Sequence, residues 1–205
     1  MPGRTLQTEA FVLLKRPPAD SFQTFTVFSA EHGTLLILQR VAKKSSASSV
    51  PLDLFDEVAL LLESSNQGQT WFVKEARFQT RHPGIGRSYD ALRFASLFAA
   101  LIARNSVHEE SRATVARLLQ TALAAFETAD RADIVFFKSL YLFARDEGYP
   151  VKQQWVATLT EADRTRAAAL LNQPLAEQTT AAPEVARLQR RLEDYLRGHT
   201  EVLLD

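Results

Sequence analysis

The chain has 205 residues, 46% hydrophobic and 23% charged, with 24 basic and 24 acidic side chains and no cysteine. This composition is typical of a soluble globular protein, and the balanced charge excludes a global cationic field, so nucleic-acid binding must be confined to patches. The lack of cysteine excludes disulfides and thiolate metal sites. Because no apolar run resembles a signal peptide or a membrane span, we expect a cytoplasmic protein without a membrane segment.

The first third of the chain has strand patterns. Thr8–Leu14 predicts a strand that Lys15-Arg16-Pro17-Pro18 ends, because proline cannot donate to a ladder. Phe22–Ser29 and Thr34–Arg40 predict a hairpin whose turn, Glu31-His32-Gly33, contains a glycine free to take positive φ. A basic and serine-rich loop follows, beginning with Lys43 and Lys44.

Two more strands complete the expected barrel. Leu54–Leu62 fits either a short helix or a buried strand, and we choose a strand because it lies between two strand signals. Asn66-Gln67-Gly68 is typical of a hairpin turn, and Thr70–Thr80 predicts the fifth strand. Five short strands in roughly eighty residues favour an OB-fold β-barrel, which we assign to residues 1–82.

From residue 83 onward the apolar period becomes helical, so we expect an all-α domain over residues 83–205 and an α+β protein overall. Gly148-Tyr149-Pro150 is typical of a helix end, and Thr160 of a helix start. The expected helices are one capped by Ser88 or Asp90, Glu109–Thr128, one starting at Asp130 or Asp133, Glu161–Asn172, and one with Pro183 in its first turn that runs to His199.

Several of these strings resemble the start of the bacterial recombination mediator RecO family. They are Glu9–Leu13, the paired prolines, Thr26–Ser29 with Glu31–Gly33, and Ala42–Ser45, and Phe143–Pro150 (FARDEGYP) resembles a helix end of that family. The resemblance runs over about residues 8–156. Many members have a four-cysteine zinc site after the Gly-Tyr segment, and this chain has no cysteine, so we expect no zinc. The serine-rich loop also replaces a lysine- and arginine-dense one.

The resemblance implies a protein of DNA repair and recombination after DNA damage. It implies binding of single- and double-stranded DNA through the OB-fold and annealing of complementary strands. It also implies two protein partners, RecR and the acidic, hydrophobic C-terminal tail of single-stranded-DNA-binding protein (SSB), so that RecA can load on SSB-coated DNA.

Eight cations lie at or near strand ends and loops of the predicted barrel, where they could follow a phosphate backbone. They are Lys15, Arg16, Arg40, Lys43, Lys44, Arg77, Arg81 and Arg87. The alternative is that they are solvated loop charges. Six aromatic residues could stack on bases, although we favour core packing for each: Phe11, Phe25, Phe28, Trp71, Phe72 and Phe78.

The third expected helix suggests a place for the SSB tail. Phe137 and Tyr141 fall on one apolar stripe, with Lys138 and Arg145 beside it. An acidic peptide ending in a bulky apolar residue needs both a pocket and positive charge. The alternative is that Phe137 and Tyr141 are core residues.

No motif predicts an enzyme, because the chain lacks a Walker loop, a G-x-S-x-G elbow and an H-E-x-x-H pair. The four histidines are scattered without ligand spacing, so we expect no metal and no cofactor. The competing function is a protein-interaction adaptor that does not bind DNA, which the neutral net charge favours. Titration with oligonucleotides at low and high salt separates the two.

Overall fold

The computed structural model describes residues 4–19, 21–41, 51–64 and 68–204. Lys43, Lys44 and most of the expected turn at 66–68 lie outside these residues. The chain divides into two compact units, which we describe separately. The first consists of Met1–His82 with Ile102–Leu119, and the second of Pro83–Leu101 with Gln120–Asp205.

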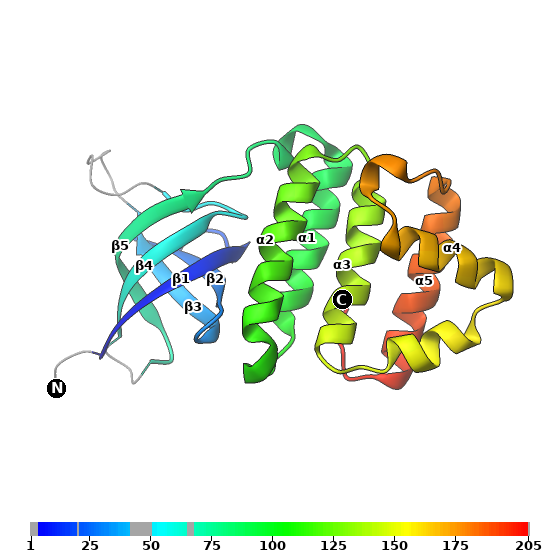
Figure 1. The fold of residues 1–205 in the computed structure, drawn as a ribbon. Coiled ribbons are helices and arrows are strands. Elements are labelled where there is room, and N and C mark those ends of the chain that lie inside the picture. The colour runs from blue at the N-terminus through cyan, green and yellow to red at the C-terminus, as the bar shows by residue number, and fades with distance from the viewer. Residues whose placement is uncertain (1–3, 20, 42–50, 65–67, 205) are drawn as a thin grey trace. The chain divides into compact units, whose positions relative to one another are not determined.

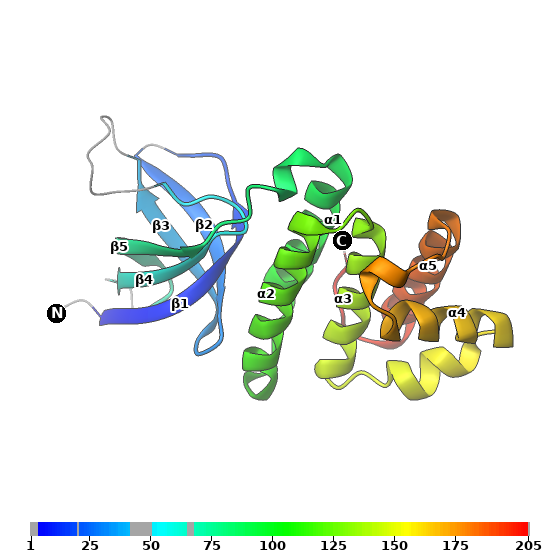
Figure 2. The same cartoon turned by 45° about the horizontal axis from the view of Figure 1, so that its top comes forward.

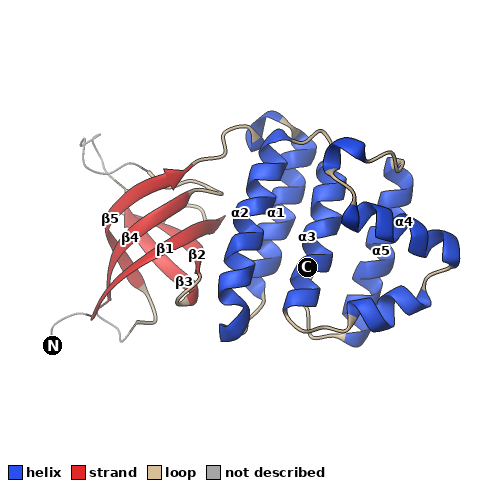
Figure 3. Cartoon of the chain, viewed as in Figure 1, coloured by secondary structure: helices blue, strands red, loops and turns tan. Residues whose placement is uncertain are grey.

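The first unit is built on a closed five-stranded barrel (Figure 3). Its strands follow the order β1-β2-β3-β5-β4, with β3 and β5 parallel and the other neighbours antiparallel. This confirms the predicted OB-type barrel. The strands are β1 (Arg4–Lys15), β2 (Phe22–Ser29), β3 (Gly33–Arg40), β4 (Glu57–Ser64) and β5 (Trp71–Thr80).

An irregularity in β1 lets this strand close the barrel. Its residues up to Phe11 pair with β4, and its residues from Phe11 onward pair with β2. The register shifts between Val12 and Leu14, as expected where a bulge bends a strand around a barrel. Alternate residues of the strands fill the interior, among them Val12, Phe25 and Ile37.

The β2–β3 turn is built as the sequence predicts. Gly33 has a φ of +69°, a backbone conformation that is strained for residues with a side chain. The Ser29 hydroxyl accepts hydrogen bonds from the Glu31 and His32 N–H groups, at 3.1 and 3.3 Å. Arg112 donates from Nη1 to the Glu31 carbonyl oxygen at 3.3 Å, so the start of α2 (Arg112–Thr128) holds this turn.

The sequence of Leu54–Leu62 fits either a short helix or a strand. The segment is a strand, β4, but it starts at Glu57 rather than Leu54. The cause is a turn before it, in which Phe55 takes a φ of +68°. Asp56 stabilises this turn by accepting a 2.8 Å hydrogen bond from the Asp53 N–H.

The rest of the chain is helical, as predicted, and Figures 1 and 2 show it from two directions. The long helices besides α2 are α1 (Tyr89–Arg104), α3 (Ala132–Asp146), α4 (Glu161–Asn172) and α5 (Ala182–His199). Shorter helical turns are Ile85–Arg87, Glu109–Ser111, Val151–Trp155, Val156–Thr158 and Leu175–Glu177.

Most helix ends follow their predicted signals. Ser88 Oγ accepts from the Ala91 N–H, Thr160 Oγ1 accepts from the Asp163 N–H at 3.2 Å, and Gly148 takes a φ of +87° after α3. The start of α3 differs, because its N-cap is Arg131 and no side chain caps it. Asp133 instead forms a 2.9 Å ion pair with Arg131.

Candidate nucleic-acid interface

Two arginines lie on the outer face of the barrel, on either side of β2. Phe25 is buried, so alternation directs its neighbour Thr24 outward. The Arg16 N–H donates to the Thr24 carbonyl oxygen at 3.0 Å, and Arg40 of β3 is in register with Phe22. Both arginine side chains are exposed, and neither forms an ion pair with a residue that the structure describes. These guanidiniums can therefore bind an anion without first breaking such a pair.

An aromatic pair lies on the same face. The rings of Phe22 and Phe72 meet edge to face, with centroids 5.5 Å apart. Phe72 of β5 is in register with Leu38 of β3, the strand that also carries Arg40. Both phenylalanines are half-buried, so part of each ring is open to solvent. Half-exposed rings beside arginines are the combination that single-strand binding proteins use for base stacking.

Sequence reasoning included Phe72 among the aromatic candidates but missed Phe22. Phe22 is the first residue of its strand, and only the register with Arg40 shows that it belongs to this face. The other aromatic candidates are buried or packed against the barrel core. Phe11, Phe25, Phe28 and Trp71 are buried, and Phe78 packs against the core with the Arg81 guanidinium 3.9 Å from its ring centre.

Lys15 and Arg81, in contrast, are tied to the turn before β4. Lys15 Nζ lies 3.0 Å from Asp53, and Arg81 lies 3.2 Å from Asp56. Partial burial raises the pKa of Asp56, although a hydrogen bond from the Asp53 N–H and the Arg81 charge oppose it. For Asp53, burial also acts to raise the pKa, but hydrogen bonds from Leu54 and Lys15 outweigh it and leave the pKa lowered. A phosphate would have to share these cations with carboxylates.

The remaining barrel candidates have other surroundings. Arg77 lies on the outer face of β5 and lines a shallow pocket of about 480 Å³ together with Glu9, Glu31 and Glu75. These carboxylates oppose a phosphate that approaches Arg77. Arg87 is exposed, but it belongs to the second unit, in the helical turn Ile85–Arg87.

The apolar stripe expected as a tail site on α3 is part of the core, which corrects its interpretation as open surface. Phe137 is fully buried and Tyr141 is 7% exposed, because both rings pack against Trp155, with ring centres 6.2 and 6.0 Å away. Lys138 donates to the Gln173 carbonyl oxygen at 2.7 Å, and partial burial lowers its pKa. The Arg145 guanidinium pairs with Asp146 at 2.7 Å.

Another pocket of the second unit has the two properties that the sequence placed at this stripe. It has a volume of about 400 Å³ and is lined by α1, α3 and α5. Its apolar lining includes Phe94, Phe136 and Leu140. Its charged lining consists of Arg93, Arg190, Arg197 and Glu193. Sequence reasoning missed this pocket because three helices that are distant in the chain contribute to it.

Within the described part of the chain, no group of three or more histidine, aspartate or glutamate side chains could hold a metal ion. In the same part, no helix combines the length and apolar character that a membrane span needs. No protein-family model matches this chain, and no curated protein matches it either.

Proposed function

We propose that this protein is a DNA repair and recombination mediator of the RecO type, acting in the cytoplasm. It binds single- and double-stranded DNA, anneals complementary strands and, with RecR, helps to load RecA on SSB-coated DNA. The observation that carries this proposal is the outer face of the barrel, where Phe22 and Phe72 lie with Arg16 and Arg40. In OB-folds, oligonucleotides bind on the face of strands 2 and 3.

The chemistry of this face suits a single strand without sequence preference. Every base has a π-face, so Phe22 and Phe72 can stack on any base, and each stacked base contributes about 1–3 kcal/mol. Arg16 and Arg40 neutralise phosphates and release counterions, which makes binding weaken as salt rises. Neither contribution uses a base edge, so the expected binding is non-specific.

The tail of SSB would bind in the second unit. The pocket lined by α1, α3 and α5 supports this part of the proposal, because it offers an apolar surface for a bulky side chain and a surplus of arginine for carboxylates. Lys138 and Arg145 stay candidates from the sequence, although each already has a partner, the Gln173 carbonyl and Asp146.

A protein-interaction adaptor is the second candidate function, and one observation favours it. The outer surface of β4 and its neighbours carries the carboxylates of Glu9, Glu57, Glu63 and Glu75. Such a surface repels DNA and suits a cationic partner protein. An adaptor would bind its partner through this surface and would need no nucleic acid.

Fluorescence anisotropy with a labelled single-stranded dT oligonucleotide of 20 residues separates the two functions. We expect R16Q/R40Q to reduce the slope of log K against log salt by about 0.7 for each lost phosphate contact. The matched control is K74Q, which removes a barrel cation that is paired with Glu63 and should leave the slope unchanged. No binding by the unmodified protein at low salt would favour the adaptor. Unaltered binding by R16Q/R40Q would exclude this face.

A further inference from the structure

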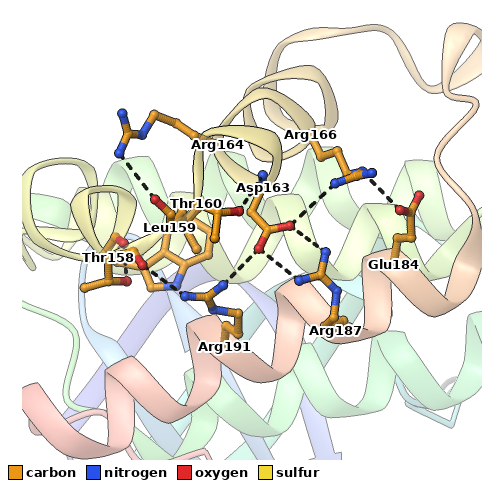
Figure 4. Close-up of polar contacts among 10 residues, drawn as sticks. Thr158, Leu159, Thr160, Asp163, Arg164, Arg166, Glu184, Arg187 and Arg191 are labelled. Atoms are coloured by element: carbon orange, nitrogen blue, oxygen red, sulfur yellow. Dashed lines mark hydrogen bonds and ion pairs between the residues drawn. The ribbon is translucent and has the colours of Figure 1, made fainter.

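A buried carboxylate forms ion pairs with arginines of α4 and α5 (Figure 4). Asp163, in the first turn of α4, is 3% exposed. Arg187 donates hydrogen bonds to both carboxylate oxygens of Asp163, one of them at 2.9 Å. Arg191 forms an ion pair with the same carboxylate at 2.9 Å. Arg166 lies 3.7 Å away on the other side. We call Asp163, Arg166, Arg187 and Arg191 the Asp163 cluster.

The Asp163 cluster has more positive charge than its carboxylates balance. The guanidinium of Arg166 is shared with Glu184 at 3.0 Å, whereas Arg164 points away from Asp163 and donates to the Leu159 carbonyl oxygen at 3.3 Å (Figure 4). Three guanidiniums therefore face two carboxylates, a surplus of one positive charge. The three guanidiniums repel one another, and an added anion would relieve this repulsion.

The arginines are held in place but not covered. Arg191 also donates to the Thr158 carbonyl oxygen at 3.0 Å, which fixes its second amino nitrogen. The side chains of Arg166, Arg187 and Arg191 are still 40%, 43% and 35% exposed. Guanidiniums that are already oriented lose little conformational entropy when they bind an anion, and their planar fork matches phosphate oxygens.

We propose that the Asp163 cluster binds backbone phosphates of a nucleic-acid strand, as a second contact surface besides the barrel. Asp163 is a positioning residue, which orients the arginines and does not touch the strand. All members of the Asp163 cluster are charged, so the cluster matches a phosphate chain better than the apolar side chain that the α1–α3–α5 pocket suits. This inference rests on the proposed DNA function, and it gives an annealing protein a surface for a second strand.

The first test is the salt dependence of binding to the labelled dT 20-mer. The variant R166Q/R191Q keeps the Asp163–Arg187 pair, so the buried carboxylate stays neutralised. We expect the salt slope to fall by about 0.7 for each of the two contacts. The control R131Q removes an arginine of the same unit that is paired with Asp133, and should not change the slope. An unchanged slope and affinity in folded R166Q/R191Q would overturn the inference.

A second measurement uses the unmodified protein and does not depend on the stability of the variant. Phenylglyoxal modifies accessible arginines, and mass spectrometry reads each site. The dT 20-mer should protect Arg166 and Arg191 but not Arg197. Equal modification of Arg166 and Arg191 with and without the dT 20-mer would refute the inference. So would equal protection by inorganic phosphate at the same phosphate concentration, which would indicate a free-phosphate site.

The two proposals fail in different ways. If R16Q/R40Q leaves the slope unchanged and R166Q/R191Q lowers it, the barrel face is wrong and the Asp163 cluster stands. The reverse result supports the barrel and removes the cluster.

Discussion

Replacing Phe22 by alanine tests whether the aromatic pair stacks on bases. The substitution removes one ring and also the edge-to-face contact, at 5.5 Å, that supports the Phe72 ring. Loss of one stacked base costs about 1–3 kcal/mol, so F22A should bind the dT 20-mer roughly 5- to 150-fold more weakly. The aromatic pair itself contributes about 0.5–1.5 kcal/mol to folding, which leaves the protein folded at 25 °C.

The salt dependence distinguishes this loss from the loss of a cation. Phe22 touches no phosphate in the proposed mechanism, so F22A should weaken binding at every salt concentration by the same factor and keep the slope. R40Q should change the slope. The matched control is L61A, because Leu61 is another half-buried apolar residue, on the outward side of β4 and in register with Glu75 rather than with Phe72.

A double-mutant cycle then asks whether the two rings form one platform. If they do, F22A/F72A should cost less than the sum of the single substitutions, since each single change already disturbs the partner ring. Anisotropy titrations of the four proteins at one salt concentration measure this. Binding of F22A within twofold of the unmodified protein, with the variant folded by circular dichroism, would refute the stacking mechanism.

Three further outcomes follow from the helical elements. T160A removes the hydroxyl that caps α4 and should lower the free energy of unfolding in urea by about 0.5–2 kcal/mol. The hydrogen bonds from Arg187 lower the pKa of Asp163 from 3.8 to about 2, so its carboxylate stabilises the fold above pH 3.8, and this contribution is lost as the pH falls towards 2. D163N should therefore be less stable at neutral pH and should lose less stability over that acid interval, as acid titration by circular dichroism can measure. R190E in the α1–α3–α5 pocket should weaken an SSB-tail peptide about tenfold by calorimetry and leave DNA affinity nearly unchanged, whereas K138E/R145E should have a smaller effect on the peptide because both cations are already engaged.

The barrel could be predicted from the sequence because its signals are local. Strand alternation, the Pro17-Pro18 stop and the positive φ of Gly33 each act within a few residues, and together they define the hairpin at the centre of the barrel. The boundary of β4 could not be predicted in the same way. Phe55 takes a positive φ that its residue type disfavours, and its N–H donates at 2.9 Å to the carbonyl oxygen of Val12, a residue of β1 that is distant in the sequence.

The tail site predicted on α3 shows a second limit of prediction from sequence. Helical periodicity gives Phe137 and Tyr141 one common face, but periodicity does not show what covers that face. Trp155 covers both rings, and it comes from the π-helical turn Val151–Trp155, which has no recognisable sequence pattern. A stripe of aromatics on a helix is therefore a prediction of burial, whereas a pocket between helices needs the tertiary structure.

The distribution of ion pairs shows that a chain with no net charge can still expose local positive charge. Lys15 and Arg81 have carboxylate partners at 3.0 and 3.2 Å, so their charges are largely compensated locally. Arg16 and Arg40 have no such partner among the described residues, and the Asp163 cluster has more guanidiniums than carboxylates. Counterion release depends on local charge that a phosphate can neutralise rather than on the sum over the chain. Sequence position near a strand end does not separate these two kinds of cation, because the partners Asp53 and Asp56 are brought to them by the closure of the barrel.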